Sequence, residues 1–322
     1  MLSYDLKTGY SCNNRCKHCV IEDSKDKLKD NGEKIDLTTE ECFSQIEYAK
    51  SCGATNVVLT GGEVTIRKDF IDLIKKCQSC NLNVTVQTNG RMLQKKEILD
   101  KISKDDNITF VVALHGSKSD THDSITQVVG SFNETCQGIK QLCSNGILVV
   151  VKVVMSKVNM YELPDIVSLS NELGVKYICF AFPHGQGAAR ANFDIIIPRY
   201  SDVNVLLEET IMRAEKCGIQ IEFEDIPYCI IPKHMKLVGE LKYLNKGALC
   251  TQVGEETYNW NEVRKSIKSK GAQCSSCDLN NLCEGVWSEY VEAFGDKEFR
   301  PIKLSDKYKE ALYCYLSKNK VK

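Results

Sequence analysis

The chain has 322 residues, of which 43% are hydrophobic and 26% are charged, and its formal net charge is −1. This length can bury one large core and a smaller one. A near-neutral chain without a long basic stripe does not favour nucleic acid as the main partner. No apolar run approaches the roughly 20 residues that span a bilayer. We therefore expect a cytoplasmic enzyme without a membrane or nucleic-acid partner.

The chain begins with a predicted strand over residues 2–10, and three cysteines follow it. Cys12, Cys16 and Cys19 have the spacing C-x3-C-x2-C, with His18 inside the loop. Three thiolates on one tight loop can hold three corners of a cubane iron–sulfur cluster, which leaves one iron open. Structural zinc takes four ligands, and no fourth ligand lies close in sequence. Disulfides are disfavoured by an odd total of 17 cysteines and by the absence of an apolar signal segment.

Alternating strands and helices are predicted over the next 170 residues. Apolar, β-branched runs at 56–60, 82–88, 108–114, 147–155 and 177–182 indicate five further strands. Amphipathic helices separate them; one of these, at 70–77, keeps i, i+3, i+4, i+7 apolar spacing. Six β-then-α units indicate a parallel sheet wrapped by helices, buried on both faces. Six units are too few for an eight-stranded barrel.

The cysteine loop and the TGGEV run at 60–64 together resemble the signature of the radical S-adenosylmethionine (SAM) enzymes. The resemblance implies an α/β fold in which residues 1–190 form a partial (β/α)6 TIM-like barrel. It also implies a [4Fe–4S] cluster on the three cysteines, with SAM bound at the open iron. Polar motifs follow the predicted strands at their carboxyl ends, where barrels of this type place their chemistry.

The resemblance also implies which side chains bind SAM. Glu63 corresponds to the residue that holds the SAM ammonium, and the glycines beside it let backbone approach a ligand closely. The serine and arginine that follow strand four in similar enzymes are absent; Thr126 stands at the arginine position. Other groups must then help to anchor SAM. The complete set of candidates is Thr60, Gly61, Gly62, Glu63, His18, Asn89, Ser117 and Lys152.

His115 is the candidate catalytic histidine, because it follows the fourth predicted strand. Two interpretations remain open for it. It can act in the active site as a group that titrates near neutral pH. It can also simply hydrogen-bond the turn in the position where similar enzymes have an aspartate.

The last third of the chain contains a second cysteine group. After a connecting helix and strand at 191–228, Cys274, Cys277 and Cys283 form C-x2-C-x5-C. This spacing resembles the SPASM and twitch extensions of radical SAM enzymes. Trp287 stands where the larger module has another cysteine, which implies a twitch-like module over 229–300 with one auxiliary [4Fe–4S] cluster.

The fourth auxiliary ligand has two candidates. Cys229 follows Pro227, which fixes the local backbone, and is preferred to Cys250 in a looser segment. A four-cysteine zinc site is the alternative to a cluster. A basic excess over 233–270 predicts a solvated face or a surface for an acidic peptide, and residues 301–322 are expected to form a helical tail.

The predicted function is formation of a 5′-deoxyadenosyl radical and hydrogen abstraction from a ribosomally made peptide, giving a thioether or carbon–carbon crosslink. Oxidation or rearrangement of a small sugar, nucleotide or cofactor precursor is the alternative, and a non-catalytic iron–sulfur sensor is a remote third. The expected electron donor is a ferredoxin or flavodoxin. No leader-peptide domain precedes the cysteine loop, so we expect such a domain to be a partner chain or to be unnecessary.

Overall fold

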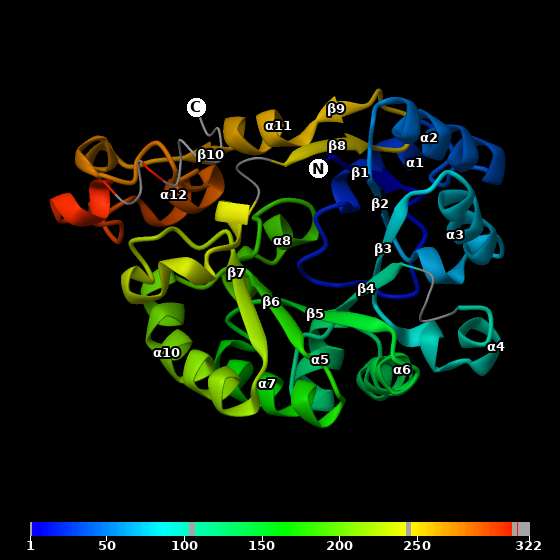
Figure 1. The fold of residues 1–322 in the computed structure, drawn as a ribbon, viewed down its shortest axis with the longest axis horizontal. Helices are drawn as coiled ribbons and strands as arrows, with labels where there is room; N and C mark the ends of the chain where they lie inside the picture. Colours follow the sequence, from blue (N-terminus) through cyan, green and yellow to red (C-terminus); the bar gives the residue numbers. More distant parts are fainter. Residues whose placement is uncertain (1, 103–106, 243–245, 311–313, 315–322) are drawn as a thin grey trace.

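The computed structural model describes residues 2–102, 107–242, 246–310 and 314. Nine strands form one curved sheet in the order β7-β6-β5-β4-β3-β2-β1-β8-β9, in which only β9 is antiparallel to its neighbour (Figure 1). A separate two-stranded antiparallel sheet joins β10 to β11. The strands are β1 Leu2–Lys7, β2 Asn56–Thr60, β3 Asn83–Thr88, β4 Ile108–Ala113, β5 Leu148–Val154, β6 Tyr177–Ala181, β7 Gln220–Glu224, β8 Gly247–Thr251, β9 Tyr258–Asn259, β10 Lys268–Ser269 and β11 Val286–Trp287.

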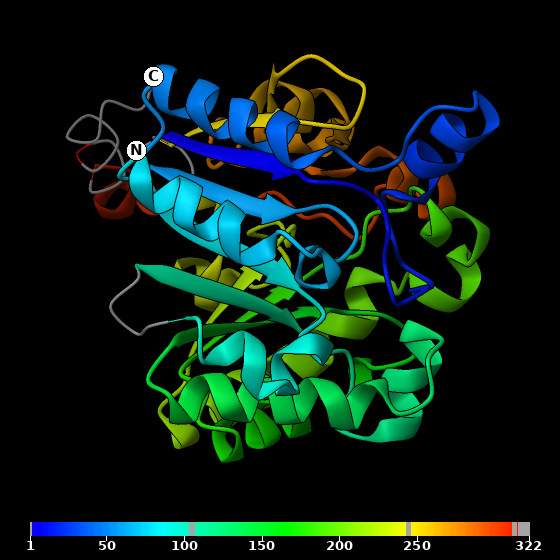
Figure 2. The same cartoon turned by 90° about the vertical axis from the view of Figure 1, so that its right-hand side faces the viewer.

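The helices lie mainly on the outer face of the curved sheet (Figures 1 and 2). Among the described residues, none is both long and apolar enough to cross a membrane. The α-helices are α1 Glu22–Asp30, α2 Thr39–Ser51, α3 Phe70–Ser79, α4 Lys96–Leu99, α5 Ser119–Thr126, α6 Ser131–Ser144, α7 Leu163–Glu172, α8 Ala188–Ala191, α9 Phe193–Ile196, α10 Tyr200–Cys217, α11 Trp260–Ser266 and α12 Ser288–Phe294.

Alternation along the strands separates an apolar outer face from a more polar inner face. In β4, Ile108 and Phe110 are buried whereas Thr109 and Val111 are half-buried. Successive strand residues point to opposite faces, so the outer set packs under the helices and forms the core. The apolar residues of α3, predicted from their spacing, are all buried. The inner face lines a cavity. The sheet is therefore not buried on both faces, and that expectation from the sequence was wrong.

The partial barrel predicted from the sequence is confirmed, and its sheet is larger than expected. All six predicted strands are present, although the first ends at Lys7 rather than continuing to Tyr10. Strand β7, in the segment predicted to connect the modules, pairs with β6. Strand β8 pairs with β1, and the hydroxyl of Tyr4 contacts the hydroxyl of Thr251 there. The C-terminal third thus completes the sheet. Half of the predicted tail, residues 311–313 and 315–322, lies outside the described residues.

Candidate active site

The cysteine loop, residues 12–19, leaves the carboxyl end of β1 and is held by backbone hydrogen bonds from two sides. The N–H groups of Arg15 and Lys17 each donate to a carbonyl of α5 at 3.0 Å. On the other side, the N–H of Ala188 donates to the carbonyl of Cys19 at 2.8 Å. The loop is thus fixed between two of the segments that follow barrel strands.

Two glycines bring the loop after β2 against the segment that leads into the cysteine loop. A β-carbon on Gly61 would lie 2.1 Å from the carbonyl oxygen of Gly9, and one on Gly62 would lie 2.2 Å from that of Ser11. The N–H of Gly62 donates to Gly9 at 2.8 Å, and the N–H of Glu63 donates to Ser11 at 2.9 Å. In this structure the glycines permit a close approach between two parts of the chain itself.

The Glu63 carboxylate is buried at the centre of this arrangement and is 3% exposed. Its Oε1 accepts hydrogen bonds from the N–H and hydroxyl of Thr65, at 3.0 and 2.5 Å, and from the hydroxyl of Thr88 at 2.6 Å. Its Oε2 accepts the N–H of Asn89 at 2.6 Å. Burial raises the pKa of Glu63 although these bonds oppose the shift. A carboxylate oxygen can accept more than one bond, so Oε2 retains capacity for a ligand cation.

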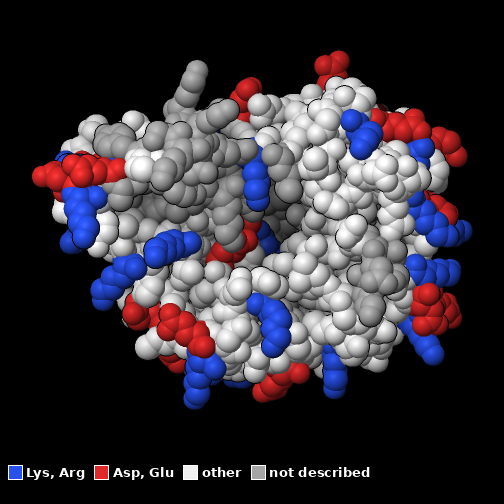
Figure 3. Space-filling model, viewed as in Figure 1, with Lys and Arg blue, Asp and Glu red and all other residues white. Residues whose placement is uncertain are grey.

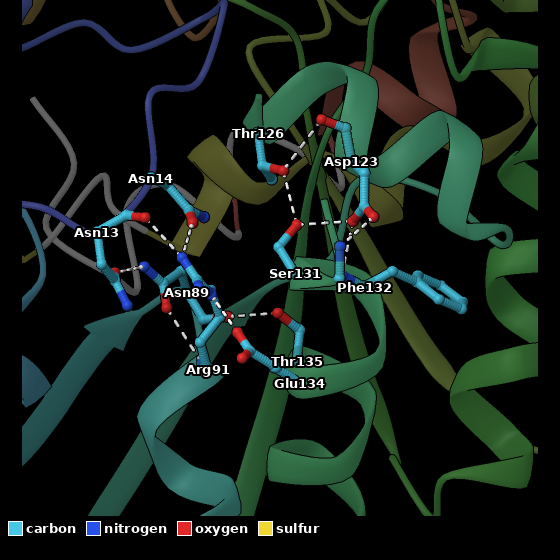
Figure 4. A network of polar contacts seen from close by, with 12 residues as sticks. Asn13, Asn14, Asn89, Arg91, Asp123, Thr126, Ser131, Phe132, Glu134 and Thr135 are labelled. Carbon is cyan, nitrogen blue, oxygen red and sulfur yellow. Dashed lines mark hydrogen bonds and ion pairs between the residues drawn. The ribbon is translucent and has the colours of Figure 1, made fainter. Parts of the chain in front are cut away.

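Arg91, just beyond β3, reaches into the cysteine loop (Figure 4). Its Nη1 donates to the carbonyl of Asn13 at 2.5 Å and to Oδ1 of Asn14 at 2.8 Å. Its Nε donates to Glu134 of α6 at 2.5 Å. The side-chain amide of Asn89 also donates to Oδ1 of Asn13, at 2.7 Å. The cysteine loop, the segment that follows β3 and helix α6 thus meet at one polar network.

The predicted histidines His18 and His115 come together, and a third histidine joins them. The rings of His18 and His115 meet edge to face with centroids 4.4 Å apart, and His122 stacks 5.9 Å from His115. Burial is the main cause that lowers the pKa of each, to about 4 for His18 and His122. The backbone N–H of Val154 donates to Nδ1 of His115 at 3.4 Å, and Asn159 donates to the His115 carbonyl at 3.0 Å. Burial thus favours the neutral form of all three rings.

Three other candidates for SAM binding are engaged within the protein. The hydroxyl of Thr60 donates to a glutamine of β3 at 2.9 Å. The N–H and the hydroxyl of Ser117 both donate to Glu162 at 2.8 Å. The ammonium of Lys152, on the inner face of β5, forms an ion pair with Glu224. Of the sequence candidates, the ones gathered around the cysteine loop are His18, Gly61, Gly62, Glu63, Asn89 and His115.

The thiols of the loop have the chemistry of cluster ligands. Burial raises the pKa of Cys12 to about 11, and the pKa values of Cys16 and Cys19 are also raised. A cationic iron site favours the thiolate form and reverses such shifts. The N–H of Asn14 donates to the Cys12 sulfur at 3.4 Å.

A cavity of about 1090 Å³ occupies the barrel interior and opens near the centre of the face in Figure 3. Its lining extends from the amino ends of the strands, at Asn83 and Asn107, to the carboxyl end of β7 at Glu224. Within it, ligand atoms of Cys179, Glu222 and Glu224 lie within 4.8 Å of one another. Acidic side chains of β7 and the basic side chains of Lys152, Lys246 and Arg264 therefore line the same cavity.

A buried ion-pair cluster lies where the C-terminal third meets the cavity. The ammonium of Lys268 is fully buried and lies 2.7 Å from Asp225, 3.0 Å from Glu284 and 3.7 Å from Glu240. Arg264 pairs with Glu284 at 2.6 Å. These two basic residues do not belong to a solvated face, because the carboxylates of neighbouring segments surround them.

The two-stranded sheet β10–β11 separates this cavity from a second pocket. Trp287 is 5% exposed, lines the cavity and stacks on His184 with ring centroids 3.9 Å apart. Lys268 pairs with Trp287 in the register, and Ser269 pairs with Val286. Ser269 and Val286 line the second pocket instead. Because adjacent residues of a strand point to opposite faces, this short sheet is a wall between the two spaces.

The second pocket brings four of the predicted auxiliary ligands together. It is lined by Cys229, Cys274, Cys277 and Cys283. Backbone N–H groups donate to the sulfurs of Cys277 and Cys283 at 3.3 and 3.4 Å. Burial raises the pKa of Cys229 to about 11, and Cys283 and Cys274 add to that shift. Cys250 is elsewhere: it is buried in β8, and its sulfur lies 3.9 Å from a carboxylate oxygen of β1.

Sequence reasoning did not identify the acidic and aromatic residues of the cavity or the role of Arg91. The pair Glu222 and Glu224 could have been predicted from the sequence, because two carboxylates two residues apart in a strand point to the same face. The contacts of Arg91 and of Lys268 depend on segments far apart in sequence. No local pattern identifies them.

The model of the Radical SAM superfamily matches residues 6–169. The Fe-coproporphyrin III synthase of Methanosarcina barkeri is 28% identical over 297 residues, which cover 90% of this chain and 69% of the relative. The antilisterial bacteriocin subtilosin biosynthesis protein AlbA of Bacillus subtilis is 27% identical over 189 residues, which cover 59% of this chain and 40% of AlbA.

Streptococcus suis SuiB, solved bound to the precursor peptide SuiA, has a similar fold. The TM-score is 0.66 at 17% sequence identity, and the alignment covers 94% of this chain and 75% of SuiB. At this identity the likeness concerns the fold alone. It includes the C-terminal third as well as the barrel.

Proposed function

Because the chain belongs to the radical SAM superfamily, which implies a [4Fe–4S] cluster and SAM, we propose that it cleaves SAM reductively and uses the resulting radical to modify a peptide. A bound cluster supplies the electron that splits SAM into methionine and a 5′-deoxyadenosyl radical. The residues of this chain bind and orient the reactants. The cavity keeps water and stray hydrogen donors away from them.

The proposed SAM site lies around the cysteine loop. Cys12, Cys16 and Cys19 hold three irons, and the buried carboxylate of Glu63 accepts a bond from the SAM ammonium. The ring of His18 lies within the same loop and remains neutral, so it can contact an uncharged part of SAM. The observation that supports this arrangement is the hydrogen bonding of Glu63 to β3 beside the loop.

We assign Cys229, Cys274, Cys277 and Cys283 as ligands of one auxiliary [4Fe–4S] cluster. All four line one pocket, whereas Cys250 lies in β8. The wall formed by β10 and β11 lies between this pocket and the cavity. These four thiols would hold the cluster on the far side of that wall, where it could accept an electron from a substrate radical.

A peptide substrate is supported by the size of the cavity. Its volume of about 1090 Å³ lies at the upper end of the range of roughly 300–1,000 Å³ for small-ligand pockets, which leaves room for a residue of a peptide and its neighbours. The substrate residue that enters meets the carboxylates of β7 and the aromatic face around Trp287. A small-molecule substrate is the second candidate. The Fe-coproporphyrin III synthase, whose alignment covers 90% of this chain, is named for a small-molecule product.

The direct test is SAM cleavage by the anaerobically reconstituted protein after reduction. We expect 5′-deoxyadenosine and methionine, and none from a variant with all three loop cysteines changed to Ala. Glu63→Gln should keep its iron and bind SAM about 10- to 100-fold more weakly, since a charge-assisted bond is worth roughly 1.5–3 kcal/mol. Cluster and SAM binding without cleavage would favour the sensor instead.

The substrate class requires a separate experiment. The enzyme is incubated with SAM and a short Cys- or aromatic-rich peptide encoded beside its gene, and the peptide mass is measured. A crosslinked product is lighter by two hydrogen atoms. An unmodified peptide, with 5′-deoxyadenosine formation stimulated instead by a small metabolite, would transfer the assignment to the second candidate.

A further inference from the structure

Arg91 lies within the polar network but is neither a sulfur ligand nor a candidate for SAM binding. Its side chain is 14% exposed, and its guanidinium bonds Asn13 and Asn14, the two residues that directly follow the first loop cysteine. The Nε of the same guanidinium donates to Glu134 of α6. One planar group thus bonds two residues of the loop and a residue of α6.

A second chain of bonds connects this contact to Glu63. The N–H of Arg91 donates to Oδ1 of Asn89 at 3.1 Å, and the amide of Asn89 donates to Oδ1 of Asn13 at 2.7 Å. The N–H of Asn89 donates to Glu63 at 2.6 Å. A displacement of the loop therefore strains bonds that also hold the Glu63 carboxylate.

The geometry suits arginine and not lysine. A guanidinium presents several N–H donors in one rigid plane, whereas an ammonium is a compact charge on a flexible stem. Here Nη1 serves two acceptors on the loop while Nε serves Glu134. The ion pair with Glu134 offsets the positive charge of Arg91. The main contribution of Arg91 is therefore to orient the loop.

We propose that Arg91 is a positioning residue. It holds the cysteine loop in a fixed position relative to Glu63, so that the distance between the open iron and the site of the SAM ammonium stays constant. This inference rests on the proposed SAM binding at Glu63. Neither bond nor electron transfer passes through Arg91. Its contribution is to the affinity for SAM and to the electronic contact between SAM and the cluster.

The test uses the full chain, reconstituted anaerobically, in the variants Arg91→Lys and Arg91→Gln. Iron content is measured first, and then SAM is titrated while the electron paramagnetic resonance spectrum of the reduced loop cluster is recorded. We expect iron to be retained and the SAM-dependent change of the spectrum to require about tenfold more SAM in both variants, because neither Lys nor Gln presents the planar donors that bond Asn13, Asn14 and Glu134 together.

Two controls make this result specific. Glu134→Gln keeps the bonds from Arg91 to the loop and should shift the titration less than Arg91→Gln. Arg213→Gln removes a guanidinium of α10 that bonds Ser168, away from the network, and should leave the titration unchanged.

Three outcomes would contradict the proposal or its premise. An unchanged titration in both Arg91 variants would overturn the positioning role. Loss of the loop iron from both would also overturn it, because Arg91 would then be needed simply to bind iron. A wild-type spectrum that does not respond to SAM would instead refute the proposed function, which makes the two failures distinguishable.

Discussion

Lys268 lies directly opposite Trp287 in the two-stranded wall, and its ammonium is 4.7 Å from the centroid of the indole ring. The same ammonium faces three carboxylates, of Asp225, Glu240 and Glu284. Removing one partner of a buried ionic group leaves the others uncompensated. Lys268 therefore joins the wall between the cavity and the cysteine pocket to a cluster of carboxylates, in which Arg264 also pairs with Glu284.

Lys268→Met should lower the free energy of unfolding by about 3–5 kcal/mol, because buried Asp225 and Glu240 lose the Lys268 ammonium, although Glu284 retains Arg264. Urea denaturation followed by circular dichroism measures it. Lys265→Met is the matched control, since Lys265 is exposed on α11, and it should change stability by less than about 0.5 kcal/mol. Equal effects of the two substitutions would contradict a structural role for the buried ammonium.

The stability of the protein should depend on the titration of Glu240. Burial, with Asp225 beside it, raises the pKa of Glu240 to about 7. The folded state then holds a proton that the unfolded state has released, so this contribution to stability falls as pH rises from about 4.5 to about 7. Glu240→Gln should remove this decline, which is on the order of 1–3 kcal/mol.

Unfolding free energies of wild type and Glu240→Gln at several pH values between 5 and 8 test this directly. The wild-type curve should fall between pH 5 and about 7, whereas the variant curve should lack this fall, so the difference between the two curves should change with pH and then level off. Glu256→Gln, at an exposed position, should instead run parallel to wild type. If Glu240→Gln is also parallel to wild type, the shifted titration is refuted.

Gly62→Ala should displace the cysteine loop. Its β-carbon would lie 2.2 Å from the carbonyl oxygen of Ser11, and a backbone atom cannot move aside as a side chain can. We expect reconstituted protein to lose most of the loop iron, about four atoms per chain, and to keep the iron of the auxiliary pocket. In Gly53→Ala the added carbon meets nothing within 4 Å, and the positive φ of 80° strains only the turn after α2, so that variant should keep both sets of iron.

The fourth auxiliary ligand can be assigned by iron analysis. If both clusters are cubanes, wild type should carry about eight iron atoms and Cys229→Ala about four. Cys250→Ala should remain near wild type, because that thiol is buried in β8 against β1. The opposite pattern would give the role to Cys250. A zinc-loaded, iron-free pocket in anaerobically prepared protein would exclude the auxiliary cluster.

The sequence alone was sufficient to predict those features of the fold that depend on neighbouring residues. The spacing of the loop cysteines and the alternation within the strands each reflect neighbouring residues, and both led to the correct barrel. Strand β8 was missed because GALCT is short and begins with glycine, and because its partner β1 is remote in sequence. The two glycines of TGGEV were identified as a close approach, but only the fold reveals that the approaching groups belong to Gly9 and Ser11.

The pairing of β1 with β8 has a consequence for synthesis of the chain. Tyr4 and Thr251 contact each other although they are 247 residues apart in sequence. On the ribosome β1 therefore emerges first, and one of its edges remains without a hydrogen-bonding neighbour until most of the polypeptide has followed. An unprotected strand edge is a template for pairing with other chains. The nascent barrel is consequently most vulnerable to aggregation just before its last parallel strand arrives.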